Sequence, residues 1–174
     1  MDVETRVMIN NLTQDIIDYY SIEIPITDMS DVVEKKMGGR IEETTRIEEL
    51  ADGSVEKAGD NFIIKVSPFQ SEERKRFTIA HELGHLFLHM GYKTNQKIWD
   101  SQKERHYYRS GSSLIEYQAN EFAAALLMPR KKYLEILDDY TENSIVDTPE
   151  VAEYFGVSVS AASNRGKFLG YLKW

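Results

Sequence analysis

The sequence predicts an α+β fold, and three observations support this class. Apolar residues recur at helical spacing along most of the chain, two strand-like segments flank a turn-forming stretch at 58–60, and 174 residues suffice for one well-formed core. We therefore expect a single domain over residues 1–174. It divides into N-terminal helices and the first strands over 1–60, a core region over 61–129 and a helical region over 130–174.

The first third of the chain is expected to form two helices followed by strands. One helix spans about 4–19, and a second spans about 27–37, with Asp28 or Ser30 as its cap and two glycines after its end. Residues 40–46 have strand-like composition, and 53–57 and 61–66 are typical of a hairpin. The apolar residues expected near one face of the first helix are Val7, Met8, Leu12, Ile16 and Ile17.

Most of the remaining chain is predicted to be helical. One helix is expected from Ser71 to Gly91 and another from Ser113 to Met128, where Pro129 ends it. A short amphipathic helix over about 131–140 and two further helices joined by a tight turn follow. The polar stretch 92–112 is expected to be a long loop, either a mobile lid or a plain connection.

Composition excludes several classes of protein. The formal net charge of −8 disfavours nucleic-acid binding unless the basic residues cluster. The chain has no cysteine, which excludes disulfides, thiolate metal sites and a cysteine nucleophile. It also has no apolar run of 18 residues and no basic-then-apolar leader, so we expect a cytoplasmic protein without a membrane span.

The strongest chemical signal is the pentapeptide His81-Glu82-Leu83-Gly84-His85. Residues four apart share one face of a helix, so the two imidazoles can reach one zinc ion at about 2.0–2.1 Å. Glu82 is rotated about 100° from His81, which takes its carboxylate off the metal but leaves it near a zinc-bound water. The pattern indicates a zinc site with Glu82 as the general base of a metalloprotease. The alternative is a chance match on a buried helix, with histidines that only serve the core.

A catalytic zinc needs a third protein ligand, and Glu116 is the best candidate. Asn120 lies four residues later on the same helical face and can orient a ligand histidine. The alternative for Glu116 is a capping box with Ser113. His89 is expected to hydrogen-bond near the site or to cap the helix end rather than to bind zinc, and Glu121 is expected to be a solvated surface acid.

These residues resemble the ImmA/IrrE family of bacterial and phage metallopeptidases. The resemblance is strong over 61–129, continues into 151–170 and is weak before residue 61. The motifs that carry it are Arg76-Phe77-Thr78-Ile79-Ala80-His81-Glu82-Leu83-Gly84-His85 and Glu116-x-x-Ala119-Asn120-x-Phe122-Ala123-Ala124-x-Leu126-Leu127-Met128-Pro129.

The resemblance implies a compact zincin-like fold. It has a small antiparallel sheet, the motif helix and a further helix that brings Glu116 as third zinc ligand. The resemblance also implies an antirepressor, which removes a helix-turn-helix repressor of a mobile element or stress circuit by cutting it. Two alternatives from other classes remain: a non-cleaving antirepressor or toxin–antitoxin component that binds its partner, and a DNA-binding regulator with a vestigial metal site.

Peptide hydrolysis also needs a donor for the oxyanion and a place for the substrate backbone. His106, Tyr107, Tyr108 and Arg109 could supply the donor, although they could equally be plain surface residues. Residues 61–66 or their hairpin partner could pair with the substrate as an added strand.

The C-terminal helix pair follows a helix-turn-helix pattern around Gly156. Its second helix is poor in groups that read bases, so we expect a structural or substrate-gripping pair and do not expect DNA binding.

Overall fold

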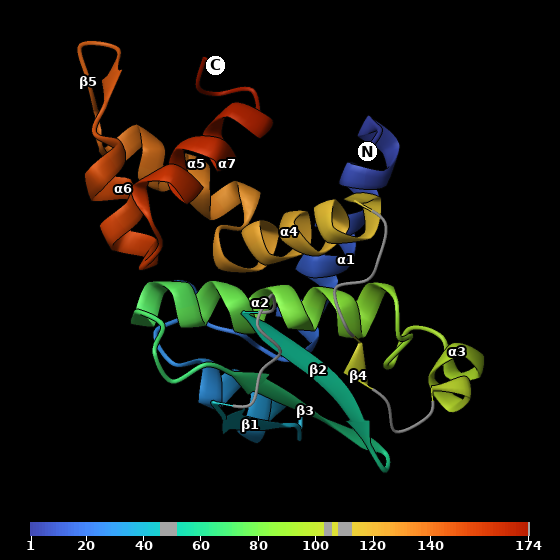
Figure 1. Ribbon diagram of the computed structural model, residues 1–174. Helices are drawn as coiled ribbons and strands as arrows, with labels where there is room; N and C mark the ends of the chain where they lie inside the picture. Colours follow the sequence, from blue (N-terminus) through green and yellow to red (C-terminus); the bar gives the residue numbers. More distant parts are fainter. Residues whose placement is uncertain (46–51, 103–105, 108–112, 174) are drawn as a thin grey trace.

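Helix α2, which carries the pentapeptide, lies at the centre of this computed structural model, between a sheet and a layer of helices (Figure 1). The structure describes residues 1–45, 52–102, 106–107 and 113–173. The helices are α1 (Val3–Tyr19), the π-helical η1 (Asp31–Lys36), α2 (Glu72–Leu88), α3 (Gln96–Ser101), α4 (Ser113–Leu127), α5 (Arg130–Asp139), α6 (Thr148–Phe155) and α7 (Val159–Phe168). The strands are β1 (Arg40–Glu43), β2 (Gly53–Ala58), β3 (Asn61–Val66), β4 (His106–Tyr107), β5 (Thr141–Glu142) and β6 (Ile145–Val146).

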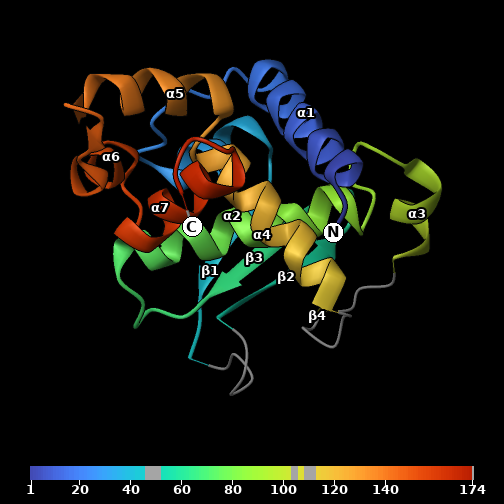
Figure 2. The ribbon, with the colours of Figure 1, turned by 90° about the horizontal axis from the view of Figure 1, so that it is seen from above.

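The arrangement is the α+β fold that the sequence predicts, built in layers. The four-stranded sheet has the order β1-β3-β2-β4, and α2 covers one of its faces. Helix α4 crosses α2 on the side away from the sheet, and α1 packs against α4 (Figures 1 and 2). Helices α5, α6 and α7 gather near the start of α2. This stacking places α2 between the sheet and α4, where its apolar and motif residues are buried together.

The sheet differs in one strand from the all-antiparallel one that was expected. The β2–β3 hairpin, with its turn at residues 59–60, is confirmed, and β4 pairs with β2 in the antiparallel sense. However, β1 runs parallel to β3, from Arg40↔Ile63 to Glu43↔Val66. A parallel neighbour requires a long connection, and here the hairpin's strand β2 supplies part of it before the chain returns in β3. Among the described strands, β1 and β4 are therefore the edges and β3 is interior.

The buried face of α1 matches the predicted one in part: Ile16 and Ile17 are buried and Leu12 packs against the core, but Val7 and Met8 do not lie on that face. Val7 and Met8 are 53% and 59% exposed, whereas Ile9, Thr13, Ile16 and Ile17 are buried. Thr13 is tolerated there because its hydroxyl donates to the Ile9 carbonyl at 2.7 Å. The four buried residues share one helical face, and the contact of α1 with α4 covers it.

The expected 92–112 loop is partly folded, which corrects the prediction of a stretch without secondary structure; whether it acts as a lid or as a plain connection stays a prediction. Tyr92 and Trp99 are buried with their rings 5.0 Å apart, and the Tyr92 hydroxyl donates to the Met37 carbonyl at 3.1 Å. Helix α3 and strand β4 also lie within this stretch. Burial of two large aromatic rings anchors the first half to the core. Residues 103–105 and 108–112 lie outside the described part of the chain.

The C-terminal third holds the three predicted helices and one unpredicted hairpin, β5–β6. Ser71, Asp147 and Ser158 each cap the start of a helix through a side-chain oxygen, at α2, α6 and α7. Of the described helices, none is both long and apolar enough to cross a membrane.

Candidate metal centre

Close packing of α2 on α4 brings the motif histidines to Glu116. The contact is made at Gly84, where an added Cβ would lie 2.9 Å from the Ala119 Cα and 3.0 Å from the Ala119 carbonyl oxygen. A larger residue would push the helices apart. The glycine inside the motif is therefore what allows side chains of the two helices to meet.

Two imidazole nitrogens and one carboxylate converge where the helices cross. The Nε2 atoms of His81 and His85 are 3.0 Å apart. Glu116 places Oε2 at 3.3 Å from His81 Nε2 and Oε1 at 3.5 Å from His85 Nε2. The ligand atoms of these three residues all lie within 4.8 Å of one another. His81 and His85 are only 3% and 2% exposed, so the two imidazoles are shielded from bulk water, whereas the Glu116 side chain is 25% exposed.

The hydrogen bonds of the outer ring nitrogens fix the tautomers. His81 Nδ1 lies 2.9 Å from Asn120 Oδ1, which can only accept, so His81 carries its proton on Nδ1. His89 Nε2 lies 3.0 Å from Gln118 Oε1 and therefore donates, which leaves His89 Nδ1 as an acceptor. His85 Nδ1, 3.0 Å from His89 Nδ1, is then the donor in that pair. Burial lowers the pKa of His89, which favours the neutral ring that this chain of bonds needs.

This pattern leaves both Nε2 atoms with lone pairs directed at each other and at a carboxylate. Three electron-rich groups so close together repel one another unless a cation lies between them. Two ligands at about 2.0–2.1 Å from one tetrahedral ion are about 3.3 Å apart, close to the spacing seen here. Two imidazoles and one carboxylate are also a donor set that catalytic zinc sites use. The residues therefore fit a divalent metal ion.

Glu82 lies on the sheet side of the centre and is 2% exposed. Strand β2 approaches it closely at Gly53, where an added Cβ would lie 2.6 Å from Thr78 Cγ2 and 3.3 Å from Glu82 Oε1. Gly53 was not singled out from the sequence, because a glycine at a strand start is an ordinary signal. Its importance here comes from the packing of β2 on α2.

His89 supports His85 rather than completing the triad. Replacing it with alanine is expected to lower the affinity for a divalent metal ion by about 10–100-fold, because His85 loses the acceptor that fixes its tautomer and ring orientation. Competition with a chromogenic chelator measures this affinity, and Lys97→Ala on the exposed surface of α3 is the control. Unchanged affinity in a normally folded His89→Ala protein would mean that packing alone orients His85.

The oxyanion candidates receive a backbone position only. His106 and Tyr107 form β4, paired with Glu56 and Val55 of β2. Tyr108 and Arg109 lie outside the described residues. A role for any of the four stays a prediction. The same holds for the capping box, since the Ser113 side chain is not described.

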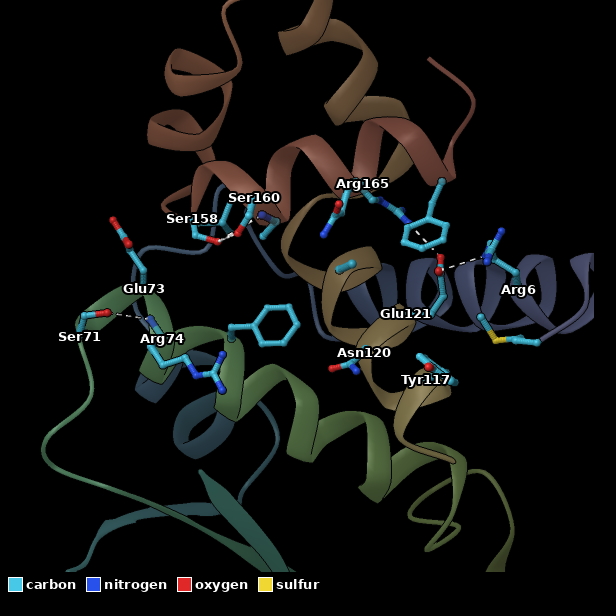
Figure 3. Close-up of a pocket in the computed structure, with 17 residues that line it drawn as sticks. Arg6, Ser71, Glu73, Arg74, Tyr117, Asn120, Glu121, Ser158, Ser160 and Arg165 are labelled. Carbon is cyan, nitrogen blue, oxygen red and sulfur yellow. Dashed lines mark hydrogen bonds and ion pairs between the residues drawn. The ribbon is translucent and has the colours of Figure 1, made fainter. Parts of the chain in front are cut away.

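Glu121 is not the solvated surface acid that was expected. It is 7% exposed, and its carboxylate lies 3.0 Å from Arg165 Nη1 and 3.3 Å from Arg6 Nε. Arg165, itself 2% exposed, also donates to the Met128 carbonyl and to Asn10 Oδ1. The prediction that Glu121 points away from Glu116 was correct. However, that face of α4 meets α1 and α7, so the acid lies in an ion-pair network between three helices (Figure 3).

A pocket of about 270 Å³ opens onto the metal centre. Its lining combines two of the three converging residues with side chains from α2 and α4: Arg74, Phe77, Thr78, His81, Glu116 and Asn120. The centre is therefore buried but has an adjoining space for a reactant.

The chain resembles known metallopeptidases in sequence and a transcriptional regulator in fold. The sequence profile described as the IrrE N-terminal-like domain, peptidase M78, matches residues 40–167. Metallopeptidase ImmA of Bacillus subtilis (strain 168) is 30% identical over 102 residues, which are 59% of this chain and 53% of that protein. A Mycobacterium tuberculosis transcriptional regulator has a similar fold, with a TM-score of 0.59 at 14% identity over 90% of this chain and 45% of that one. The chain thus spans about half the length of each of these two proteins.

Proposed function

Because the chain belongs to the ImmA/IrrE family of metallopeptidases, we propose that it is a zinc-dependent endopeptidase in which His81, His85 and Glu116 hold the ion. The observation that carries the proposal is that the imidazole Nε2 atoms of His81 and His85 and the carboxylate of Glu116 converge on one point, next to the buried Glu82. A protein that only bound its partner would have no use for Glu82.

The proposed chemistry divides between the metal and the chain. When bound, a zinc ion supplies Lewis acidity, which polarises a carbonyl and makes a water molecule more acidic. Glu82 accepts the proton of the attacking water and later passes it to the nitrogen of the leaving amine. Asn120 and His89 hold the imidazoles of His81 and His85 in the tautomers that bind metal.

We further propose that the substrate is a helix-turn-helix repressor, so that the chain acts as a cytoplasmic antirepressor. This step rests on the family resemblance, with support from the relative described as metallopeptidase ImmA. Arg165, the central cation of α7, is buried in an ion pair and is not available to DNA phosphates. This disfavours the interpretation of the C-terminal pair as a DNA-binding module.

The function is tested with a peptide library made by digesting a bacterial proteome. The zinc-loaded chain is expected to cut a defined subset of peptides, to stop after treatment with 1,10-phenanthroline and to recover on addition of zinc. Mass spectrometry of the products identifies the cleaved bonds. No cleavage by a fully zinc-loaded chain would favour the alternative of a non-cleaving binding protein.

Glu116→Gln is expected to weaken zinc binding by more than about 100-fold, because it removes a charged ligand. This loss is larger than the one expected for a residue, such as His89, that only orients a ligand. Zinc content per chain and competition with a chelator measure the effect. Glu153→Gln, on the exposed surface of α6, is the matched control. If zinc affinity stays normal and only the stability of the fold falls, Glu116 is a helix-capping residue instead.

A further inference from the structure

A second, larger cavity of about 690 Å³ lies between α7 on one side and α2 and α4 on the other (Figure 3). It adjoins the metal pocket, since Arg74, Phe77 and Asn120 line both. The two cavities therefore lie side by side, and we refer to them together as the groove between the metal centre and the C-terminal helix pair. A polypeptide cut at the centre must extend away from it on both sides of the scissile bond, and this groove offers one such path.

The lining of the groove is suited to an uncharged side chain. Its three arginines already have carboxylate partners, because Arg74 pairs with Asp52, and both Arg165 and Arg6 pair with Glu121. Between these pairs the walls carry apolar and small side chains, namely Phe77, Ala124, Ala161 and Phe168. An acidic substrate residue would lose hydration here and would have to compete with these carboxylates for the arginines.

The α7 wall of the groove is held in place by buried contacts. Arg165 donates to the Met128 carbonyl at 3.0 Å, and the Tyr133 hydroxyl donates to the Ala162 carbonyl at 2.8 Å. Arg76 of α2 donates to the Gly156 carbonyl in the turn before α7. Ser158, the N-cap of α7, and Ser160, Ala161 and Asn164 in its first two turns thereby face the groove. In a DNA-binding helix pair, this half of the second helix reads bases.

We infer that this groove is a substrate subsite, which receives a short segment of the cleaved polypeptide and selects an apolar residue, leucine or larger, near the scissile bond. The inference rests on the proposed peptidase function and adds a specificity element to it. The groove volume is in the range of pockets that enclose ligands larger than one side chain. Helix α7 is then a recognition element for substrate.

The test uses binding rather than turnover. The probes are peptide hydroxamates in which the zinc-binding group is followed, or preceded, by three residues, with leucine or glycine at each position in turn. Their affinities for the zinc-loaded chain are measured by calorimetry. At one or two positions on one side of the hydroxamate, the probe with leucine is expected to bind at least about tenfold more tightly than the probe with glycine, because the leucine side chain is buried in the groove.

Two variants fill the groove. Ala161→Trp is expected to abolish the preference for leucine while the all-glycine probe still binds, and Asn164→Trp, at an exposed position that tolerates a large residue, is expected to do the same. Val159→Trp is the matched control, since it adds the same ring to α7 at an exposed site that does not line the groove.

The outcomes separate the inference from the function on which it rests. If no hydroxamate binds the zinc-loaded chain, the proposed metal centre fails and the inference with it. If hydroxamates bind but leucine and glycine are equivalent at every position, the metal centre stands and the subsite is refuted. A leucine preference that survives both groove variants also refutes it, because the apolar site then lies elsewhere.

Discussion

Glu82→Gln is expected to lower the rate of peptide hydrolysis by about 10²–10⁴-fold while zinc content and fold are retained. The amide is almost the same size as the carboxylate but cannot accept the proton of the attacking water. Because Glu82 is buried beside Gly53, an isosteric change is needed to avoid disturbing the packing of β2 on α2. The measurement is kcat/KM on a peptide selected from the library, together with zinc content and a urea denaturation curve.

The control for this experiment is Glu72→Gln, an exposed acid in the first turn of the same helix. It is expected to keep full activity. Undiminished cleavage by Glu82→Gln would show that another group is the base. Loss of zinc by Glu82→Gln would instead mean that the carboxylate helps to hold the metal.

Removal of the buried carboxylate of Glu121 is expected to lower the free energy of unfolding more than any other substitution proposed here. Glu121→Leu leaves Arg165 charged, buried and without its carboxylate, and breaking one partner of such a pair costs about 3–5 kcal/mol of the free energy of unfolding. Urea denaturation measures the change.

A double substitution separates this effect from simple loss of packing. Glu121→Leu combined with Arg165→Met replaces both charges by apolar groups, and the double variant is expected to be more stable than Glu121→Leu alone. A double variant as unstable as the sum of its single changes would contradict a desolvated ion pair. Lys132→Ala, which removes an exposed pair with Glu135, is expected to change stability by less than about 1 kcal/mol.

Local features of the fold could be predicted because their causes lie within a few residues of sequence. Helix α2 begins directly after Ser71, whose side-chain oxygen accepts a hydrogen bond from the Arg74 backbone N–H, and the β2–β3 turn occupies the predicted position. These signals act through the backbone of their own segment, so periodicity and capping chemistry suffice to locate the elements. His81 and His85 are four residues apart, which likewise places both rings on one helical face before any tertiary contact is known.

Features that depend on distant partners were mispredicted or could not be predicted. Glu121 was expected in solvent, yet its partner Arg165 lies 44 residues away, and Arg165 meets Asn10 across 155 residues. The stretch after Gly91 was expected to be a loop, but Tyr92 contacts Met37, which is 55 residues earlier. A helical pattern indicates which residues share a face. It does not indicate whether that face meets water or another element.

The sequence by itself determined the chemistry of this protein: the helix with two imidazoles and Glu82, and a later helix that offers Glu116 and Asn120. Only the tertiary structure decided how these groups meet, through the close contact of Gly84 with Ala119, and which strand lies beside Glu82. It also decided that α7 faces a groove beside the metal centre. The physical reason is that ligand type and helical spacing are local properties, whereas the distance between two helices is set by the packing of all the side chains between them.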